Sequence, residues 1–124
     1  MLWLNTVSPL QKEEDIKRFY EEFKNSNYNS GVTVNTHHAH ALIENKPINF
    51  QVKSGFARTQ DLKSIEILNY ACMAWKIGAL KDLHDGTLFP EKFFKYESSK
   101  LSALFIKDDK DFELVGTIMK RENI

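Results

Sequence analysis

Histidines concentrate in one short stretch of the chain. The sequence VNTHHAH places His37, His38 and His40 within four positions. An imidazole can act as a general acid or base near neutral pH, or as a metal ligand. If the stretch is a strand, His38 and His40 share one face, and this spacing can present two imidazoles to one metal ion. The stretch is therefore the first candidate for chemistry.

The run KSGFART, a short distance further along the chain, has residue types that bind anions. We expect a strand to end and a helix to begin here, and free N–H groups at a helix start can hold a phosphate. A guanidinium adds a bidentate grip on such oxygens. The predicted ligand-binding residues combine the histidines with this run: His37, His38, His40, Lys53, Ser54, Gly55, Arg58 and Thr59.

A β-hairpin is expected to bring the histidines and the KSGFART run together. We predict two strands, over about residues 32–43 and 48–56. Pairing Ile43 with Ile48 places aliphatic side chains together on one face, and a slip by one residue would mix the two faces. In this register the pair His38 and His40 lies on the polar face, beside the start of the next helix.

A long helix is predicted from Thr59 to about Leu83. Its apolar residues form almost two stripes, and a surface helix needs only one. We therefore expect it to be covered on two sides, the second by another subunit or by the aromatic segment LFPEKFFKY, with self-association favoured. The predicted interface residues come from this helix and the aromatic segment: Ala74, Ile77, Gly78, Phe89, Phe93 and Phe94.

The remaining segments complete one predicted α+β domain over residues 1–124. They are a strand within Leu2–Val7, a helix that Ser8 caps, and a final hairpin from Ala103–Lys107 and Phe112–Met119 around the acidic run at 108–111. The helix is expected to have one apolar stripe, formed by Ile16, Phe19, Tyr20 and Phe23. The order is β-α-β-β-α-β-β, and its first six elements resemble a split β-α-β, or ferredoxin-like, arrangement with one strand added. We expect an antiparallel sheet with helices packed on one face. This resemblance in fold implies no particular function.

The composition limits the class of protein. The 124 residues include 17 Lys or Arg and 17 Asp or Glu, so the formal net charge is zero and nucleic acid is an unexpected partner. A single cysteine, Cys72, excludes an internal disulfide, suits a reducing compartment and is expected in the core. No signal peptide or membrane span is recognisable, so we expect a cytoplasmic protein.

These observations favour a small soluble protein that binds without catalysing a reaction, such as an inhibitor or regulatory module. It would bind a protein partner or sequester a small anionic, nucleotide-like ligand, as a homo-oligomer and without a cofactor or resident metal. The alternative is a small α+β enzyme that acts on a phosphorylated or metal-polarised substrate. His38 or His40 would then be the acid, base or ligand, and Arg58 the anion clamp.

Overall fold

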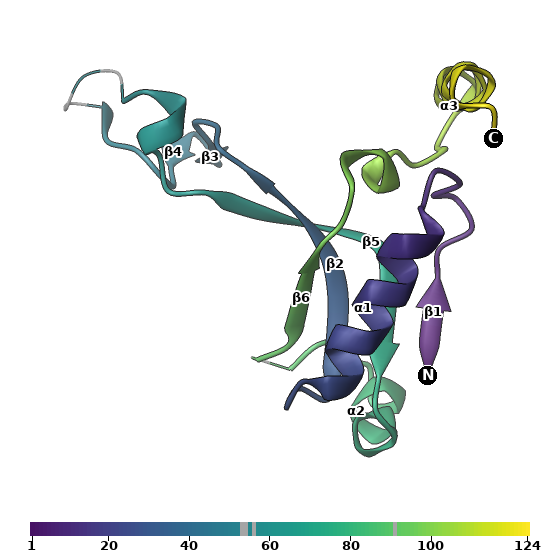
Figure 1. Ribbon diagram of the computed structural model, residues 1–124. Coiled ribbons are helices and arrows are strands. Elements are labelled where there is room, and N and C mark those ends of the chain that lie inside the picture. The colour runs from purple at the N-terminus through teal and green to yellow at the C-terminus, as the bar shows by residue number, and fades with distance from the viewer. Residues whose placement is uncertain (53–54, 56, 91) are drawn as a thin grey trace. The chain divides into compact units, whose positions relative to one another are not determined.

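The computed structural model describes residues 1–52, 55, 57–90 and 92–124, and in them the chain has the predicted α+β class. Two compact units form: unit 1 is Met1–Asn35 with Leu68–Ile124, and unit 2 is Thr36–Ile67. The helices and strands follow in the order β1 (Leu2–Leu4), α1 (Glu13–Asn25), β2 (Ser30–His37), β3 (Leu42–Ile43), β4 (Lys46–Pro47), β5 (Ile65–Trp75), α2 (Leu80–His84), β6 (Phe94–Glu97) and α3 (Asp109–Glu122) (Figure 1).

Unit 1 is built on a four-stranded sheet with the strand order β1-β5-β2-β6 (Figure 1). β1 runs antiparallel to β5, whereas β6 runs parallel to β2. The sheet is therefore mixed, and the prediction of a purely antiparallel sheet is wrong. β5 lies between β1 and β2, which is the strand order of a split β-α-β unit.

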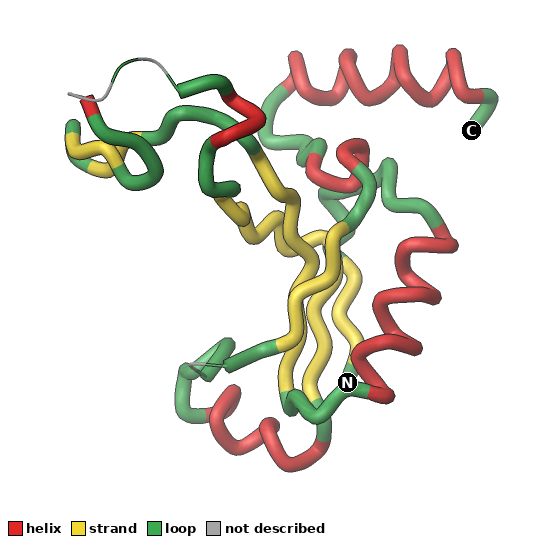
Figure 2. The backbone as a smooth tube through the Cα atoms, turned by 60° about the vertical axis from the view of Figure 1, so that its left-hand side comes forward, coloured by secondary structure: helices red, strands yellow, loops and turns green. Residues whose placement is uncertain are grey.

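Helix α1 covers one face of this sheet, and Figure 2 shows it alongside the strands. Phe19 and Phe23 of α1 are buried and pack against Cys72 and Ala74 of β5. This confirms the apolar stripe predicted for the helix. The helix begins at Glu13 rather than next to Ser8, whose hydroxyl donates to a distant backbone carbonyl instead of capping a helix.

The opposite face of the sheet is covered by the segment that follows β5. Successive residues of a strand point to opposite faces, and Met73 and Trp75 pack with Ala79, Phe89 and Phe93. Trp75 also donates its indole N–H to the carbonyl of Leu88. The prediction that helices pack on one face only is therefore wrong, because α2 and the aromatic segment lie on the second face.

The long helix predicted from Thr59 to Leu83 does not form. Thr59–Asp61 make a 3-10 turn, Ile65–Trp75 form β5, and the α-helix α2 is confined to Leu80–His84. Residues 71–75 of β5 are buried and packed on both faces, and their sequence ACMAW is continuously apolar. In β5, Cys72 and Ala74 face α1, whereas Met73 and Trp75 face the opposite side, so an alternation of period two replaces the helical stripes.

A buried polar network connects β2 and β5 through the side chain of Asn69. The side-chain oxygen of Asn69 accepts hydrogen bonds from Thr33 Oγ1 (2.6 Å) and from the backbone N–H of Ala71 (3.0 Å). Its amide nitrogen donates to Asn35 Oδ1 (2.6 Å) and Ser98 Oγ (2.8 Å). These bonds lie next to Tyr70, whose positive φ of 53° distorts β5 at this point.

The final hairpin predicted between Ala103 and Met119 is also wrong. Asp109–Glu122 form helix α3, and its N-cap Asp108 accepts a hydrogen bond from the backbone N–H of Asp111 (2.9 Å). Carboxylates in the first turn and cations in the last turn favour the helix dipole. The acidic run read as a hairpin turn is a helix start.

Unit 2 contains a short hairpin of β3 and β4. Ile43 lies opposite Lys46, two residues away from the predicted pairing with Ile48. The turn residues Glu44 and Asn45 have φ of 48° and 67°, and positive values at both positions are the mark of a two-residue type I′ turn. The turn chemistry therefore set a register that the apolar pattern did not predict.

Candidate functional site

The predicted histidines do not share a strand face. β2 ends at His37, so the alternation expected to align His38 and His40 does not reach them. His37 and His38 are exposed, whereas the His40 ring packs edge-on against Phe50 with 4.9 Å between ring centroids. Over the described ranges, no group of three or more His, Cys, Asp or Glu side chains is arranged to hold a metal ion.

The anion-binding run lacks the helix on which the prediction depended. Lys53 and Ser54 lie outside the described residues, and Gly55 is exposed with φ of 80°. Arg58 precedes the single 3-10 turn that begins at Thr59, and its guanidinium forms an exposed ion pair with Asp61 at 3.0 Å. A turn of this length has no helix dipole that could hold a phosphate.

A small cavity in unit 2 brings part of the predicted set together. It measures about 220 Å³ and is lined by His40, Phe50, Gln51, Val52 and Gly55. Of the predicted ligand-binding residues, only His40 and Gly55 are among its described lining residues. The cavity walls are mainly apolar, so this site offers little that would hold an anion.

The predicted interface residues divide between the core and the surface of unit 1. Ala74 is buried beneath α1, and Phe94 packs against Phe19 and Phe23 of that helix. Phe89 stacks on Trp75 with 6.0 Å between ring centroids, and Phe93 packs beside it. Aromatic residues of this segment therefore cover the second face of the sheet. This agrees with the alternative in which the aromatic segment of the same chain, and not another subunit, provides the second cover.

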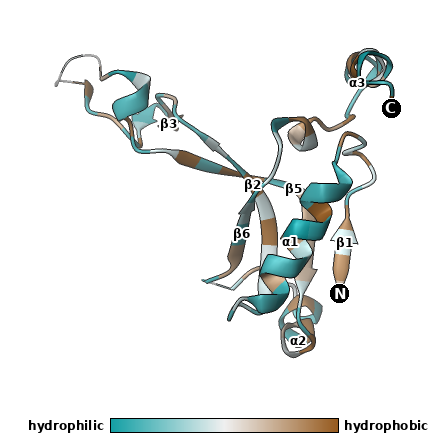
Figure 3. Cartoon of the chain, viewed as in Figure 1, coloured by the Kyte–Doolittle hydropathy of each residue, from teal (hydrophilic) through white to brown (hydrophobic). Residues whose placement is uncertain are grey.

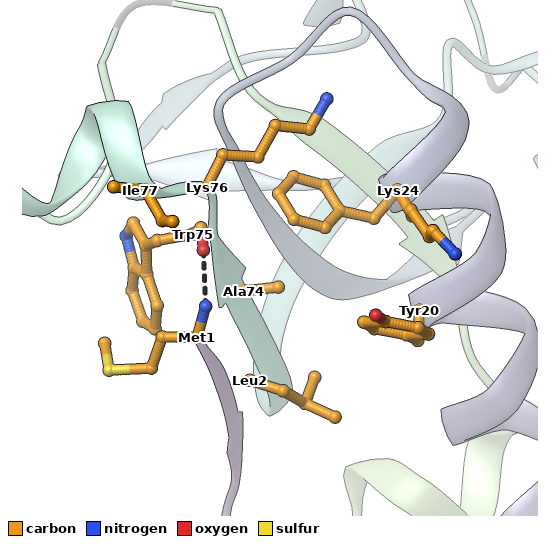
Figure 4. A pocket seen from close by; sticks show the side chains of 9 residues that line it. Met1, Leu2, Tyr20, Lys24, Ala74, Trp75, Lys76 and Ile77 are labelled. Carbon is orange, nitrogen blue, oxygen red and sulfur yellow. Dashed lines mark hydrogen bonds between the residues drawn. The ribbon is translucent and has the colours of Figure 1, made fainter.

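Ile77 and Gly78 are the two predicted interface residues that lie on the surface, in the 3-10 turn after β5. The Ile77 side chain is 86% exposed. It lines one side of an open hollow of about 400 Å³ in unit 1, where β1, α1 and the end of β5 meet (Figure 4). In Figure 4, Leu2 and Tyr20 line the hollow from β1 and α1.

The hollow has apolar walls and a cationic rim. Its walls include Leu2, Phe23 and Ala74, and none of its described lining residues is acidic. The ammonium group of Lys76 lies 5.5 Å from the centroid of the Phe23 ring and donates to a backbone carbonyl. The ammonium group of Lys24 lies 6.0 Å from the centroid of the Tyr20 ring. The hollow therefore suits an apolar group better than a small cation.

The strand beside this hollow carries large exposed apolar side chains at the edge of the sheet. In β1, Leu2 is 39% exposed, Trp3 55% and Leu4 43%. Figure 3 shows hydrophobic colours on β1 and hydrophilic colours on the outer turns of α1. We call β1, the hollow and Ile77 the β1 edge surface. The sequence prediction missed it, because the run LWL shows that a strand forms but not that the strand lies at an edge.

Cys72 has no features of a nucleophile and is a core residue, as predicted. It is 2% exposed and its thiol donates to Gln11 Oε1 at 3.0 Å. Burial, with a smaller effect of the Asp15 carboxylate, raises the pKa of the Cys72 thiol to about 11. The reactive thiolate is therefore scarce at neutral pH.

No protein-family model matches the chain, and no curated protein matches it in sequence. Within the described residues, no helix is long and apolar enough to cross a membrane. The fold and the site define a small α+β protein with an apolar, uncovered edge on a mixed sheet.

Proposed function

We propose that this chain is a non-catalytic binding protein whose partner is a protein chain, held at the β1 edge surface. One observation carries the proposal: an edge strand exposes Leu2, Trp3 and Leu4 next to an apolar hollow. Contiguous exposed apolar surface of this kind marks interaction sites on soluble proteins. Such a protein acts by occupying its partner, as an inhibitor or regulatory module does.

The two edges of the sheet differ in a way that supports this proposal. Natural proteins protect exposed sheet edges with charged side chains, because open backbone groups invite pairing with another chain. The edge strand β6 follows this rule, since it carries Lys95 and Glu97. β1 carries no charged side chain and instead presents two leucines and a tryptophan.

The two other roles considered for the chain, sequestration of an anion and catalysis, receive less support. Both relied on histidines placed beside Arg58 at the start of a long helix. That helix does not form, and the Arg58 guanidinium is paired with Asp61. Among the described residues, the β1 edge surface therefore offers the stronger basis for a function.

A site-specific photo-cross-linker tests this proposal. A benzophenone amino acid replaces Ile77 in one variant and Glu21, exposed on α1, in a matched control. Each variant is irradiated in an extract of the cells that produce the protein, and the products are identified by mass spectrometry. We expect one discrete cross-linked protein, either a second copy of this chain or another protein, from position 77 and none from position 21. Equal, diffuse labelling at both positions would refute the proposal.

A further inference from the structure

We infer that β1 pairs with β1 of a second copy of this chain, which joins two four-stranded sheets across a two-fold axis. The inference rests on the proposed function, because it names the protein that occupies the β1 edge surface. It is carried by the hydrogen-bond pattern of β1, the symmetry of its open groups and the absence of charge along it.

The hydrogen bonds of β1 show which of its backbone groups are open. Met1 and Trp75 exchange two backbone bonds, of 2.7 and 2.9 Å, and Asn5 donates to Ala71 at 2.9 Å. In an antiparallel ladder, every second residue points its N–H and C=O groups toward the same neighbour. The residues between these, Leu2 and Leu4, therefore direct their N–H and C=O groups away from β5, toward the open edge.

These open groups are self-complementary. When two copies of β1 run antiparallel with Trp3 of each copy on the two-fold axis, Leu2 lies opposite Leu4 of the second copy. Each such pair exchanges two backbone hydrogen bonds. All the outward N–H and C=O groups of Leu2 and Leu4 then have partners in this register, whereas a shift by two residues leaves some of them open. A symmetric pairing of this kind is the usual closed form of a homodimer.

The side chains fit the same arrangement. Leu2 and Leu4 pair with Ala74 and Cys72 on the α1 side, so the leucines of both copies would meet on that face. Trp3 pairs with Met73 and points to the opposite face, where the two indoles would lie side by side. Residues in a non-hydrogen-bonded pair of this type have closely spaced side chains, which favours aromatic pairs.

Charge favours a second copy at this edge. From Met1 to Gln11 no side chain is charged, and antiparallel pairing places the two N-terminal ammonium groups at opposite ends of the paired strands, so little like-charge repulsion opposes the approach of two copies of β1. Because β1 is only three residues long, the paired surface is smaller than the roughly 800 Å² per partner of a standard interface. We therefore expect a dimer that dissociates on dilution.

A disulfide trap tests the register. Trp3→Cys places two thiols at the two-fold axis, and Val7→Cys places an exposed thiol outside β1 as a control; Trp3 is 55% exposed and Val7 43%. The native Cys72 is buried and does not compete. Under mild oxidation we expect Trp3→Cys to form covalent dimers roughly tenfold faster or more, because pairing raises the local thiol concentration. Equal rates for the two variants would overturn the inference.

A proline substitution tests the backbone bonds. Leu4→Pro removes an outward N–H but leaves the bonds of Met1 and Asn5 to β5 intact, and proline is tolerated on edge strands in this orientation. Leu4→Val keeps the N–H and serves as the matched control, with circular dichroism and thermal melting to verify folding. In sedimentation over a concentration series, we expect dimers for the wild type and Leu4→Val, and monomers for Leu4→Pro. A folded Leu4→Pro variant that still dimerises would overturn the inference.

The two proposals fail in different ways. A wild-type chain that stays monomeric at all concentrations, but whose position 77 cross-links to a different protein, overturns the self-pairing and supports the proposed function. A monomeric chain with no discrete cross-link from position 77 overturns both.

Discussion

Replacing Asn69 with Ala should destabilise unit 1 strongly, because this side chain makes four hydrogen bonds in a buried position. Its oxygen accepts from Thr33 and from the Ala71 backbone, and its nitrogen donates to Asn35 and Ser98. Each buried hydrogen bond contributes about 0.5–1.5 kcal/mol, and a buried group left without a partner costs about 1–3 kcal/mol. Since these terms overlap, we expect the free energy of unfolding to fall by about 4 kcal/mol.

The assay is urea denaturation followed by the fluorescence of Trp75, which is buried in the same unit. With a slope of about 1.5 kcal/mol per molar urea, the loss lowers the midpoint by roughly 2–3 M. Asn49→Ala is the matched control, because the Asn49 side chain of unit 2 makes three hydrogen bonds, to the backbone of Ala39, Ala41 and Lys63, but nearer to solvent. Water can replace its partners, so we expect a loss below about 1.5 kcal/mol.

Two results would refute this reasoning. One is an Asn69→Ala variant within 1 kcal/mol of the wild type, where ~1 kcal/mol is the contribution of a single ordinary hydrogen bond. The other is an equal loss from Asn69→Ala and Asn49→Ala, which would mean that burial of the network is not what makes it stabilising.

Three further changes follow from single features of the structure. The Ser30 hydroxyl is buried with no partner among the described residues, so Ser30→Ala should raise the free energy of unfolding by about 1 kcal/mol, measured as an increased melting temperature. The folded state keeps the Cys72 proton between pH 9.0 and about 11 while the unfolded chain loses it, so stability should fall as the pH rises through this window. Cys72→Ala should lack this slope in urea titrations. Asn45→Gly relieves a positive φ and should slow amide exchange in the hairpin, whereas Lys46→Gly should accelerate it.

The parts of the fold that local pattern determines were predictable. The short strand β1 and the stripe of Phe19 and Phe23 on α1 were recognised from the sequence and are found in the structure. In both cases the residues that define the element are close together in the chain. Their roles follow from spacing alone.

The sequence predicts a helix where β5 forms, because the same apolar pattern is typical of a buried strand and of a helix covered on two sides. A strand covered on both faces is apolar at nearly every position, and so is a helix buried on two sides. Tyr70 adds a second difficulty, since its φ of 53° shifts the alternation: Leu68 packs on the same face as Met73 and Trp75. An even-numbered residue therefore shares a face with two odd-numbered residues, which the regular alternation of a strand does not predict.

The helix α3, in contrast, carried signals that a capping analysis could have used. Asp108 followed three residues later by Asp111 is an N-cap arrangement, and Lys120 and Arg121 lie in the last turn. The segment was read as a hairpin because the acidic run also resembles a turn. The predicted hairpin register is wrong for a related reason, since the histidine argument needed a pairing that the Glu44–Asn45 turn does not make.

The polar network holds one edge of the sheet, β6, more firmly than the other edge, β1. Asn69 connects β5 to Thr33 and Asn35 of β2 and to Ser98 just after β6, so these three strands are fixed to one another by buried side-chain bonds. The other side of β5 is paired only with the three residues of β1, through backbone bonds. An edge strand held in this way has little of its own surface buried and gains most from a further strand. The apolar sequence of β1, which would be a hazard on an uncovered edge, is the composition expected of a strand that another chain covers.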